Sequence, residues 1–166
     1  MVQVVRLFEE AAAAGHLRLA TQLNDSHLEA LQGIAQVDED SRTAVIHPRP
    51  MKQIPAGGLL TGGTSDIPVL LEAAAVLTAL GFPSKSFFDV GVAGLHRLRG
   101  VLEEIRECPV LSVAAGMAGA LPSVVAGLVD APVITVSTSI GAGISVGGKV
   151  ALHAMLASCS PGIAVV

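Results

Sequence analysis

The stretch CPVLSVAAGMAGALPSVVAGLV, residues 108–129, decides the fold that we predict for this chain. It carries no charged side chain and is long enough to span a bilayer, which takes about 20 apolar residues. Two prolines interrupt it, however, and Gly116 and Gly119 mark a change in its pattern. We therefore expect a buried strand, a tight glycine turn open to a ligand, and a small apolar helix, over residues 109–114, 116–119 and 117–129.

The composition of the chain indicates self-association. Hydrophobic residues make up 51% and charged residues 14%, with no Tyr or Trp, whereas an average soluble domain has about 25% charged residues. From Glu107 to the end the only charged residues are Glu107, Asp130 and Lys149. So few charges can hardly cover the surface of a monomer, and we expect much of the C-terminal half to face other subunits.

Charge and cysteine content also exclude several classes of function. The net charge of −4 and the lack of a basic run argue against a nucleic-acid partner. No basic and apolar leader opens the chain, so we expect a cytoplasmic protein. Two cysteines are too few for a disulfide framework, and no group of His, Cys, Asp and Glu has the spacing of a metal site.

Residues 1–55 hold about half of the charged residues and predict a small α/β segment, which we expect to be truncated. A helix over 4–14 stops at Gly15, and Asp25 or Ser26 can cap a second helix that runs to Gln32. The strands that we expect here cover residues 17–21 and 43–46, and a Pro-Arg-Pro linker follows at 48–50.

Residues 56–166 predict a nucleotide-binding domain in which strands alternate with helices. The strands are expected over 58–61, 85–90, 109–114, 131–137 and 162–166, and the helices over 67–80, 95–106, 117–129 and 149–158. Such alternation predicts a three-layer, doubly wound parallel sheet with right-handed crossovers. Ligands of these sheets bind at the carboxyl ends of the strands, where all the glycine-rich turns of this domain fall.

The turn Gly63-Thr64-Ser65-Asp66 joins the first of these strands to its helix. Its free backbone N–H groups favour an anion such as a phosphate. It can equally be a well-capped turn, because the motif is not a P-loop and has no lysine.

His96 and Arg97 begin the helix after the turn Gly91–Gly94. They can bind phosphate, and the histidine can transfer a proton near neutral pH. On spacing alone, two polar residues on an exposed helix start are the more common case.

Cys159 follows the helix over 149–158, directly before Ser160-Pro161-Gly162. A lone thiol is more often inert and buried than catalytic, so spacing alone does not make it a nucleophile. Cys108 precedes a proline away from the glycine turns and is expected to be structural. His153 lies among apolar residues and is expected in the core or at an interface.

Five segments carry a resemblance to a known family: GGTSDIPVLLEAA (62–74), DVGVAGLHRL (89–98), AAGMAGALPSVVAGL (114–128), APVITVSTSIGAG (131–143) and LASCSPGIAVV (156–166). In this order they resemble the PurE superfamily, named for the phosphoribosylaminoimidazole carboxylase of purine synthesis. The closer similarity is to its LarB branch, pyridinium-3,5-biscarboxylic acid mononucleotide synthase, which includes the circadian phase modifier CpmA.

The resemblance implies a flavodoxin-like domain assembled as an octamer, with active sites at subunit interfaces. It places His96 near the histidine of the purine enzymes' Ala-His-Arg motif. It also implies a nucleotide site formed by Gly63, Thr64, Ser65, Asp66, Gly91, Gly94, Arg97, Gly116, Met117, Ala118, Gly119, Ser139 and Gly141.

LarB-like enzymes carboxylate the pyridinium ring of nicotinic acid adenine dinucleotide and hydrolyse its phosphoanhydride, releasing AMP. The resemblance implies that Cys159 adds to the ring, because thiolate addition turns an electron-poor pyridinium into an enamine-like ring that attacks carbon dioxide. It implies carbon dioxide or bicarbonate as co-substrate and Mg²⁺ as a candidate cofactor.

One departure from the family pattern bears on activity. The LarB motif reads Gly-Met-Glu-Gly-Ala-Leu-Pro-Ser, and this chain has Ala118 at the position of the glutamate. Ala142 replaces an expected aromatic residue, and Ala120 replaces the histidine of the purine enzymes. Loss of a catalytic base lowers turnover by about 10²- to 10⁴-fold.

Three hypotheses follow from the sequence. The first is a LarB-like enzyme, and the second is a non-catalytic octameric regulator like the circadian relative. The third, another kind of Rossmann dinucleotide binder, lacks support because no G-x-G-x-x-G follows the first strand.

Overall fold

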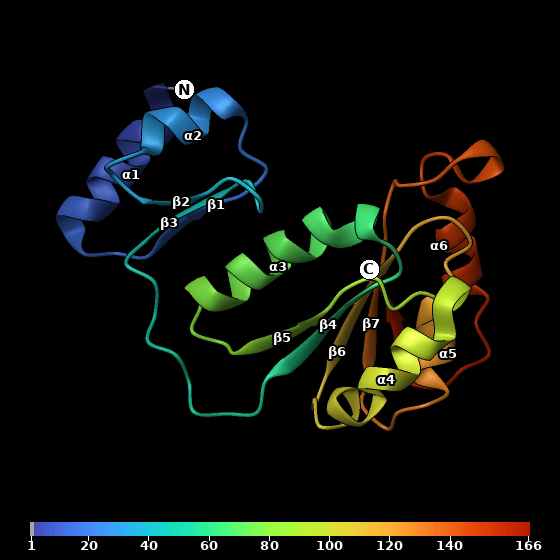
Figure 1. Ribbon diagram of the computed structural model, residues 1–166. Helices are drawn as coiled ribbons and strands as arrows, with labels where there is room; N and C mark the ends of the chain where they lie inside the picture. Colours follow the sequence, from blue (N-terminus) through green and yellow to red (C-terminus); the bar gives the residue numbers. More distant parts are fainter. Residues whose placement is uncertain (1) are drawn as a thin grey trace. The chain divides into compact units, whose positions relative to one another are not determined.

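The computed structural model describes residues 2–166 and divides them into two compact units (Figure 1). One unit comprises the residues up to Ile54 together with Leu71–Pro83, and the other comprises Pro55–Leu70 with Ser84–Val166. The domain boundary between residues 55 and 56, proposed from composition, stays a prediction.

The first unit contains a three-stranded antiparallel sheet in the order β1-β3-β2, the helices α1 and α2, and residues 71–79 of a further helix, α3 (Ile67–Ala79). Their bounds are α1 Val2–Ala14, β1 Arg18–Ala20, α2 Asp25–Leu31, β2 Gln36–Asp38 and β3 Thr43–Ile46. Phe8, Leu28 and Leu31 form its core with Ala44 of β3. The strand β2 was not expected from the sequence, because Gln-Val-Asp has a single apolar residue and no alternating pattern to reveal it.

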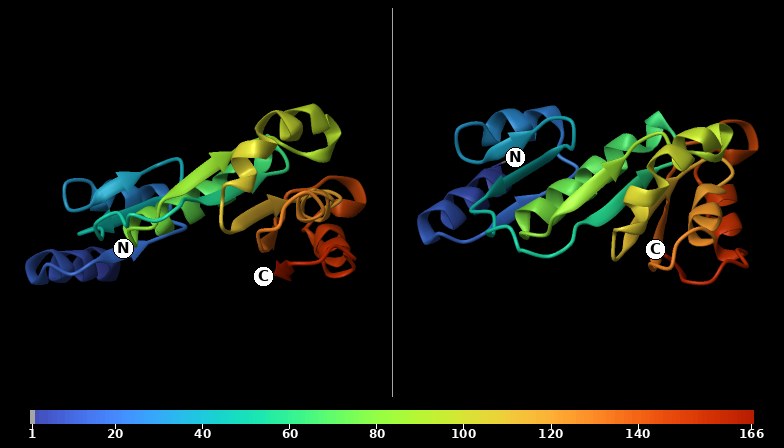
Figure 2. Two further views of the ribbon diagram at one scale, coloured as in Figure 1. Left: turned by 90° about the horizontal axis from the view of Figure 1, so that it is seen from below. Right: turned by 60° about the horizontal axis from the view of Figure 1, so that its bottom comes forward.

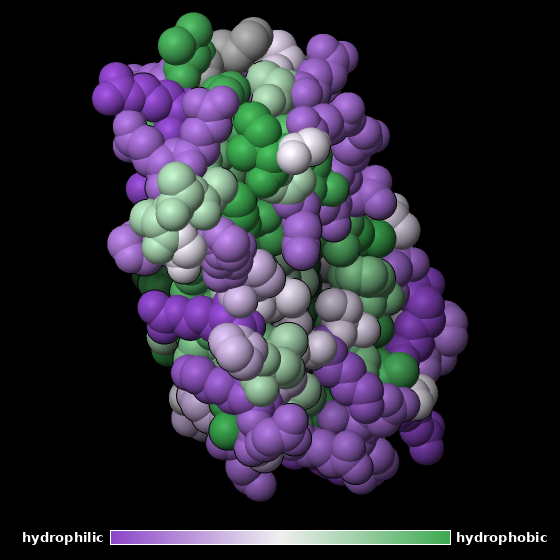
Figure 3. All heavy atoms as spheres, turned by 90° about the vertical axis from the view of Figure 1, so that its left-hand side faces the viewer, coloured by the Kyte–Doolittle hydropathy of each residue, from purple (hydrophilic) through white to green (hydrophobic). Residues whose placement is uncertain are grey.

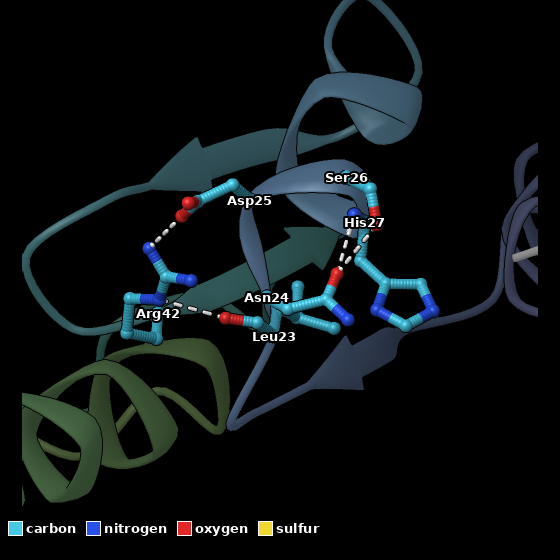
Figure 4. Close-up of polar contacts among 6 residues, drawn as sticks. All are labelled: Leu23, Asn24, Asp25, Ser26, His27 and Arg42. Carbon is cyan, nitrogen blue, oxygen red and sulfur yellow. Dashed lines mark hydrogen bonds and ion pairs between the residues drawn. The ribbon is translucent and has the colours of Figure 1, made fainter.

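The N-terminus of α2 is capped by a residue that the sequence-based prediction did not choose (Figure 4). The prediction of Asp25 or Ser26 is wrong, because the Asn24 side chain accepts the hydrogen bond from the backbone N–H of His27, at 3.0 Å. Asp25 instead binds Arg42, whose Nε also donates to the Leu23 carbonyl at 2.7 Å. Arg42 thus holds the segment before α2 and leaves Asn24 as the cap.

The surface of the chain combines polar regions with exposed apolar side chains. On the face seen in Figure 3, hydrophilic residues predominate and hydrophobic ones form separate patches. Among residues 2–166, no helix has both the length and the apolar character needed to cross a membrane. The uncharged stretch over residues 108–129 contains the strand β6 (Leu111–Ala115) and the short helix α5 (Leu121–Ala126).

The second unit contains a five-stranded parallel sheet in the order β5-β4-β6-β7-β8, seen from two further directions in Figure 2. The strands are β4 Gly57–Thr61, β5 Ser84–Phe87, β6 Leu111–Ala115, β7 Val133–Ser137 and β8 Ile163–Val165. In the order of the chain this is the 2-1-3-4-5 arrangement of flavodoxin-like folds. The predicted α/β class with a flavodoxin-like parallel sheet is confirmed.

Three helices follow β5, β6 and β7: α4 Leu95–Arg106, α5 Leu121–Ala126 and α6 Lys149–Leu156. Their connections run in the same direction across the sheet, so right-handed crossovers put them on the same face. The buried residues Ile105, Val125 and Met155, one from each helix, belong to a single core with Leu60 and Val113 of the sheet. The connection from β4 to β5 runs the opposite way, through η1 (Thr64–Asp66) and α3 (Ile67–Ala79).

Two predicted elements differ most from their expected bounds, and backbone conformation explains both differences. The helix expected over 117–129 covers only α5, because Met117 and Gly119 have positive φ angles of 49° and 60°, which no right-handed helix allows. The strand expected over 85–90 ends at Phe87, and Asp89 then turns the chain with φ 55°. Both turns lie at the carboxyl ends of strands, where the candidate site is found.

Candidate functional site

A cavity of about 240 Å³ opens at the carboxyl edge of the parallel sheet. The connections after β4 and β6 leave in opposite directions there, and ligands of doubly wound sheets bind at such switch points. Apart from the polar Ser65 and Asp66, all the lining residues are glycine or apolar. The full lining is Gly62, Gly63, Ser65, Asp66, Gly91, Val92, Ala93, Ala115, Gly116, Met117, Ala118, Gly119, Ala120, Leu121 and Ile140.

Several glycines of this edge are required because neighbouring turns touch one another. A Cβ atom on Gly91 would collide with the carbonyl oxygen of Gly62, and one on Gly116 would collide with that of Ile140. Gly119, which also has positive φ, lies against the backbone of Ala151 in α6. The turns are thus held in fixed positions by backbone contact, and they expose main chain rather than side chains to the cavity.

Asp66 is the one charged residue of the lining, and only 5% of its surface is exposed. Its Oδ2 accepts a hydrogen bond from the backbone N–H of Gly63 at 2.9 Å. Its Oδ1 accepts one from the hydroxyl of Thr138 at 2.7 Å. Because Thr138 follows β7, this carboxylate joins the turn after β4 to the loop after β7.

The structure brings together eight of the predicted nucleotide-binding residues as neighbours in the cavity wall: Gly63, Ser65, Asp66, Gly91, Gly116, Met117, Ala118 and Gly119. The other five lie in the same turns or loops but outside the cavity wall: Thr64, Gly94, Arg97, Ser139 and Gly141. Their binding roles, like those of the eight, stay predictions.

Arg97 and His96 lie in the first turn of α4, which begins at the same edge. The Arg97 guanidinium turns back onto its own loop, where Nε donates to the Asp89 carbonyl and Nη2 lies 3.2 Å from the Asp89 carboxylate. His96 is exposed and does not line the cavity. Arg97 therefore stabilises the turn after β5, and a ligand would have to extend out of the cavity to reach either residue.

Cys159 lies at the opposite edge of the sheet. It follows α6, and three residues later the carbonyl of Gly162 accepts a hydrogen bond from the Val133 N–H, at the amino ends of β7 and β8. The amino ends of parallel strands share one edge, so within one subunit the thiol and the cavity are separated by the length of the strands. The structure thus brings Cys159 together with none of the other predicted site residues of its own subunit.

The loop of Cys159 is nevertheless ordered by hydrogen bonds to α5. The hydroxyl of Ser123 donates to that of Ser158 at 2.8 Å, and the Ser160 hydroxyl donates to the Ser123 carbonyl at 2.9 Å. The Cys159 side chain between these two anchors is exposed. A thiol presented on a fixed and exposed loop is available to a partner.

Cys108 differs from Cys159 although it also precedes a strand of the sheet. It is buried, its Sγ lies 3.6 Å from the Glu104 carbonyl, and burial raises the pKa of its thiol. A raised pKa disfavours the thiolate that a nucleophile requires. These properties agree with the structural role expected for Cys108.

The charged residues of the cavity wall indicate which kind of ligand group fits it. Its wall contains no Lys or Arg, and its one ionisable side chain is the carboxylate of Asp66. Such a wall suits a neutral or positively charged group of modest size better than a phosphate.

The wall does not fit a Mg²⁺ ion held by the protein. Mg²⁺ is usually held through one or two carboxylates together with substrate phosphates. The wall has one carboxylate, that of Asp66, which is already bonded to Gly63 and Thr138, and it has no basic side chain to hold substrate phosphates beside an ion. Elsewhere in residues 2–166, no group of three His, Cys, Asp or Glu side chains could hold a metal.

Sequence reasoning missed Thr138 and Ile140 as parts of the site. Thr138 is buried and binds Asp66 across 72 positions of the chain, and the Ile140 carbonyl accepts from the Met117 N–H at 3.0 Å. No local pattern marks either residue, because their partners lie in other turns. Only their position in a loop after a central strand could have suggested them.

Comparison with known proteins agrees with this architecture. The family model described as AIR carboxylase matches residues 58–166, which include every turn of the cavity. An uncharacterized protein of Methanocaldococcus jannaschii is 46% identical over 135 residues, which cover 79% of this chain and 52% of that protein. The chain therefore spans about half the length of this relative.

Proposed function

The chain belongs to the AIR carboxylase family, and we propose that it is a cytoplasmic, LarB-like protein that binds a pyridine nucleotide in the cavity at the carboxyl edge. The single observation that carries the proposal is the wall of that cavity, which consists of bare glycine turns and one carboxylate, with no basic side chain. A pyridinium ring is flat and positively charged, so it suits such a wall. The phosphates and adenosine of nicotinic acid adenine dinucleotide would then extend outward along the rim.

The proposed chemistry begins with the Cys159 thiolate. Its sulfur forms a bond to a ring carbon of the pyridinium, and an electron pair moves onto the ring nitrogen. The resulting enamine carbon attacks carbon dioxide, a base removes the ring proton at that carbon, and the thiolate leaves as the aromatic ring is restored. In the second reaction water attacks the phosphoanhydride, a P–O bond breaks and AMP departs.

In this proposal the thiol comes from another subunit. Cys159 lies at the amino edge, and the cavity lies at the carboxyl edge of the same sheet. Large apolar side chains remain exposed at this edge: Met117 and Ile140 in the cavity wall, and Ile144 in the loop after β7, with 90% of its surface exposed. Association through this edge would bury them and bring in a neighbour's loop, in the octamer that the family resemblance implies.

Ala118 limits the expected rate. It is exposed in the cavity wall, at the position where the LarB motif has glutamate. A glutamate there would place a carboxylate beside the bound ring, as the base that removes its proton. With alanine, we expect turnover lower by about 10²- to 10⁴-fold.

Incubation with nicotinic acid adenine dinucleotide and bicarbonate tests the enzyme hypothesis. We expect slow release of AMP and of the carboxylated mononucleotide by the wild-type chain, and faster release by Ala118→Glu. Cys159→Ser is the matched control and should abolish carboxylation. If neither the wild type nor Ala118→Glu forms product while both bind the nucleotide, the enzyme hypothesis is wrong.

The absent carboxylate also favours a second candidate, a regulator that binds a nucleotide without turning it over. This protein would keep the oligomer and the cavity, as the resemblance to the circadian phase modifier suggests. Tight binding with no product from the wild type or from Ala118→Glu would support it.

A further inference from the structure

We propose that Asp66 and Thr138 are a positioning pair, which holds the loop after β7 against the turns after β4 and β6 and so sets the shape of the cavity. This inference deepens the proposed function and rests on it only for the identity of the ligand. It differs from the prediction that the Asp66 carboxylate binds the nucleotide itself.

The carboxylate accepts one hydrogen bond on each oxygen. Oδ2 accepts from the Gly63 N–H within the turn after β4, and Oδ1 accepts from the Thr138 hydroxyl in the loop after β7. Asp66 and Thr138 are both buried, so breaking the bond between them would leave buried polar groups unsatisfied. The carboxylate therefore positions the backbone of both segments.

The bond crosses the end of a strand. In the sheet β6 lies between β4 and β7, so the link from Asp66 to Thr138 passes over the turn that follows β6. A Cβ atom on Gly116 in that turn would lie 2.7 Å from the Thr138 hydroxyl. Glycine is thus required where the pair meets the third turn.

The position of Thr138 also fixes two residues of the cavity wall through backbone hydrogen bonds. Its own N–H donates to the Ala115 carbonyl at 3.3 Å, and two residues later the Ile140 carbonyl accepts from the Met117 N–H. Ile140 and Met117 both line the cavity. Loss of the Thr138 hydroxyl bond would therefore free one side of the wall while leaving the strands paired.

Thr138→Val and Thr138→Ser form a matched test, because valine keeps the shape of threonine and serine keeps its hydroxyl. We expect Thr138→Val to speed hydrogen exchange in peptides covering residues 115–119 and 138–142 by about 10- to 100-fold. This factor corresponds to the free energy that a hydrogen bond to a charged group contributes. We expect Thr138→Ser to exchange like the wild type, and the amides inside β6 and β7 to be unchanged in both variants.

Binding of AMP and of nicotinic acid adenine dinucleotide gives the second readout. We expect about tenfold weaker binding of at least one of them by Thr138→Val, and recovery in Thr138→Ser. Unchanged local exchange in Thr138→Val, or exchange that rises equally throughout the sheet, would overturn the positioning pair. If neither the wild type nor either variant binds AMP or nicotinic acid adenine dinucleotide, the proposed function is wrong. The hydrogen-exchange result then still decides whether Asp66 and Thr138 are a positioning pair.

Discussion

The two edges of the parallel sheet differ in how their loops are held. At the carboxyl edge, turns from four strands contact one another through glycine backbone and the buried bond between Asp66 and Thr138. At the amino edge, the Cys159 loop is held by hydrogen bonds of Ser158 and Ser160 to the half-buried Ser123 of α5, and the thiol itself is exposed.

In the function that we propose, the carboxyl edge therefore forms the binding site and the amino edge supplies the reactive thiol. The carboxyl edge forms a cavity within one chain, and the wall of that cavity contains no cysteine. The amino edge presents the exposed thiol of Cys159. A parallel sheet cannot bring its two edges together, so in the reaction that we propose the two parts meet between subunits.

The largest effect that we expect tests the rigidity of the carboxyl edge. Gly91→Ala should lower the free energy of unfolding by at least about 3 kcal/mol, because the new methyl group would collide with the Gly62 backbone, which cannot rotate away. Thermal or urea unfolding would measure it. Gly100→Ala in α4 is the control: nothing lies within 4 Å of its Cβ, and it should stabilise the protein by up to about 1 kcal/mol. An unchanged stability of Gly91→Ala would show that these turns move freely.

Asp66→Ala should destabilise the protein by about 1–3 kcal/mol. The change leaves the Thr138 hydroxyl and the Gly63 N–H without their acceptor in a buried place. Urea unfolding compared with Ser65→Ala, an exposed neighbour in the same turn, isolates the contribution of the carboxylate. Equal stabilities of the two variants would contradict the account of the carboxyl edge.

At the amino edge we expect a smaller loss. Ser123→Ala removes the hydroxyl that bonds to Ser158 and should cost about 1 kcal/mol, since the group is only half-buried. Cys159→Ser, at an exposed position of the same loop, should change the stability by less than about 0.5 kcal/mol. If Ser123→Ala lowered the free energy of unfolding as much as Gly91→Ala, the two edges would not differ in how firmly their loops are held.

The smallest effect concerns pH and Cys108. Burial raises the pKa of the Cys108 thiol above its unfolded value. The folded state therefore binds this proton more tightly, and the resulting stability is complete below the unfolded pKa and is lost as the pH rises through the folded pKa. Urea unfolding from pH 8 to pH 10 should show a decline in the stability of the wild type that Cys108→Ala reduces. An equal decline in the wild type and in Cys108→Ala would contradict the assignment.

Sequence patterns were sufficient for the sheet and insufficient for the cavity. The β-branched runs and the helix over Leu95–Arg106 follow from hydrophobic periodicity, and the helix was predicted with the observed bounds. The start of α5 was not predicted, because the sequence Met117-Ala118 between two glycines does not reveal a left-handed turn. The partnership of Asp66 and Thr138 joins distant parts of the chain, and local propensity carries no information about such a pair.

Crosslinking between residues 118 and 159 tests most directly the claim that the cavity receives its thiol from a neighbour. Ala118→Cys, made with Cys108 replaced by alanine, puts a thiol in the cavity wall and leaves Cys159 at the amino edge. A short bismaleimide should join neighbouring subunits, giving covalent dimers or longer ladders that disappear when Cys159→Ser is added. Crosslinks confined to single chains, or a protein that is monomeric throughout, would contradict the claim.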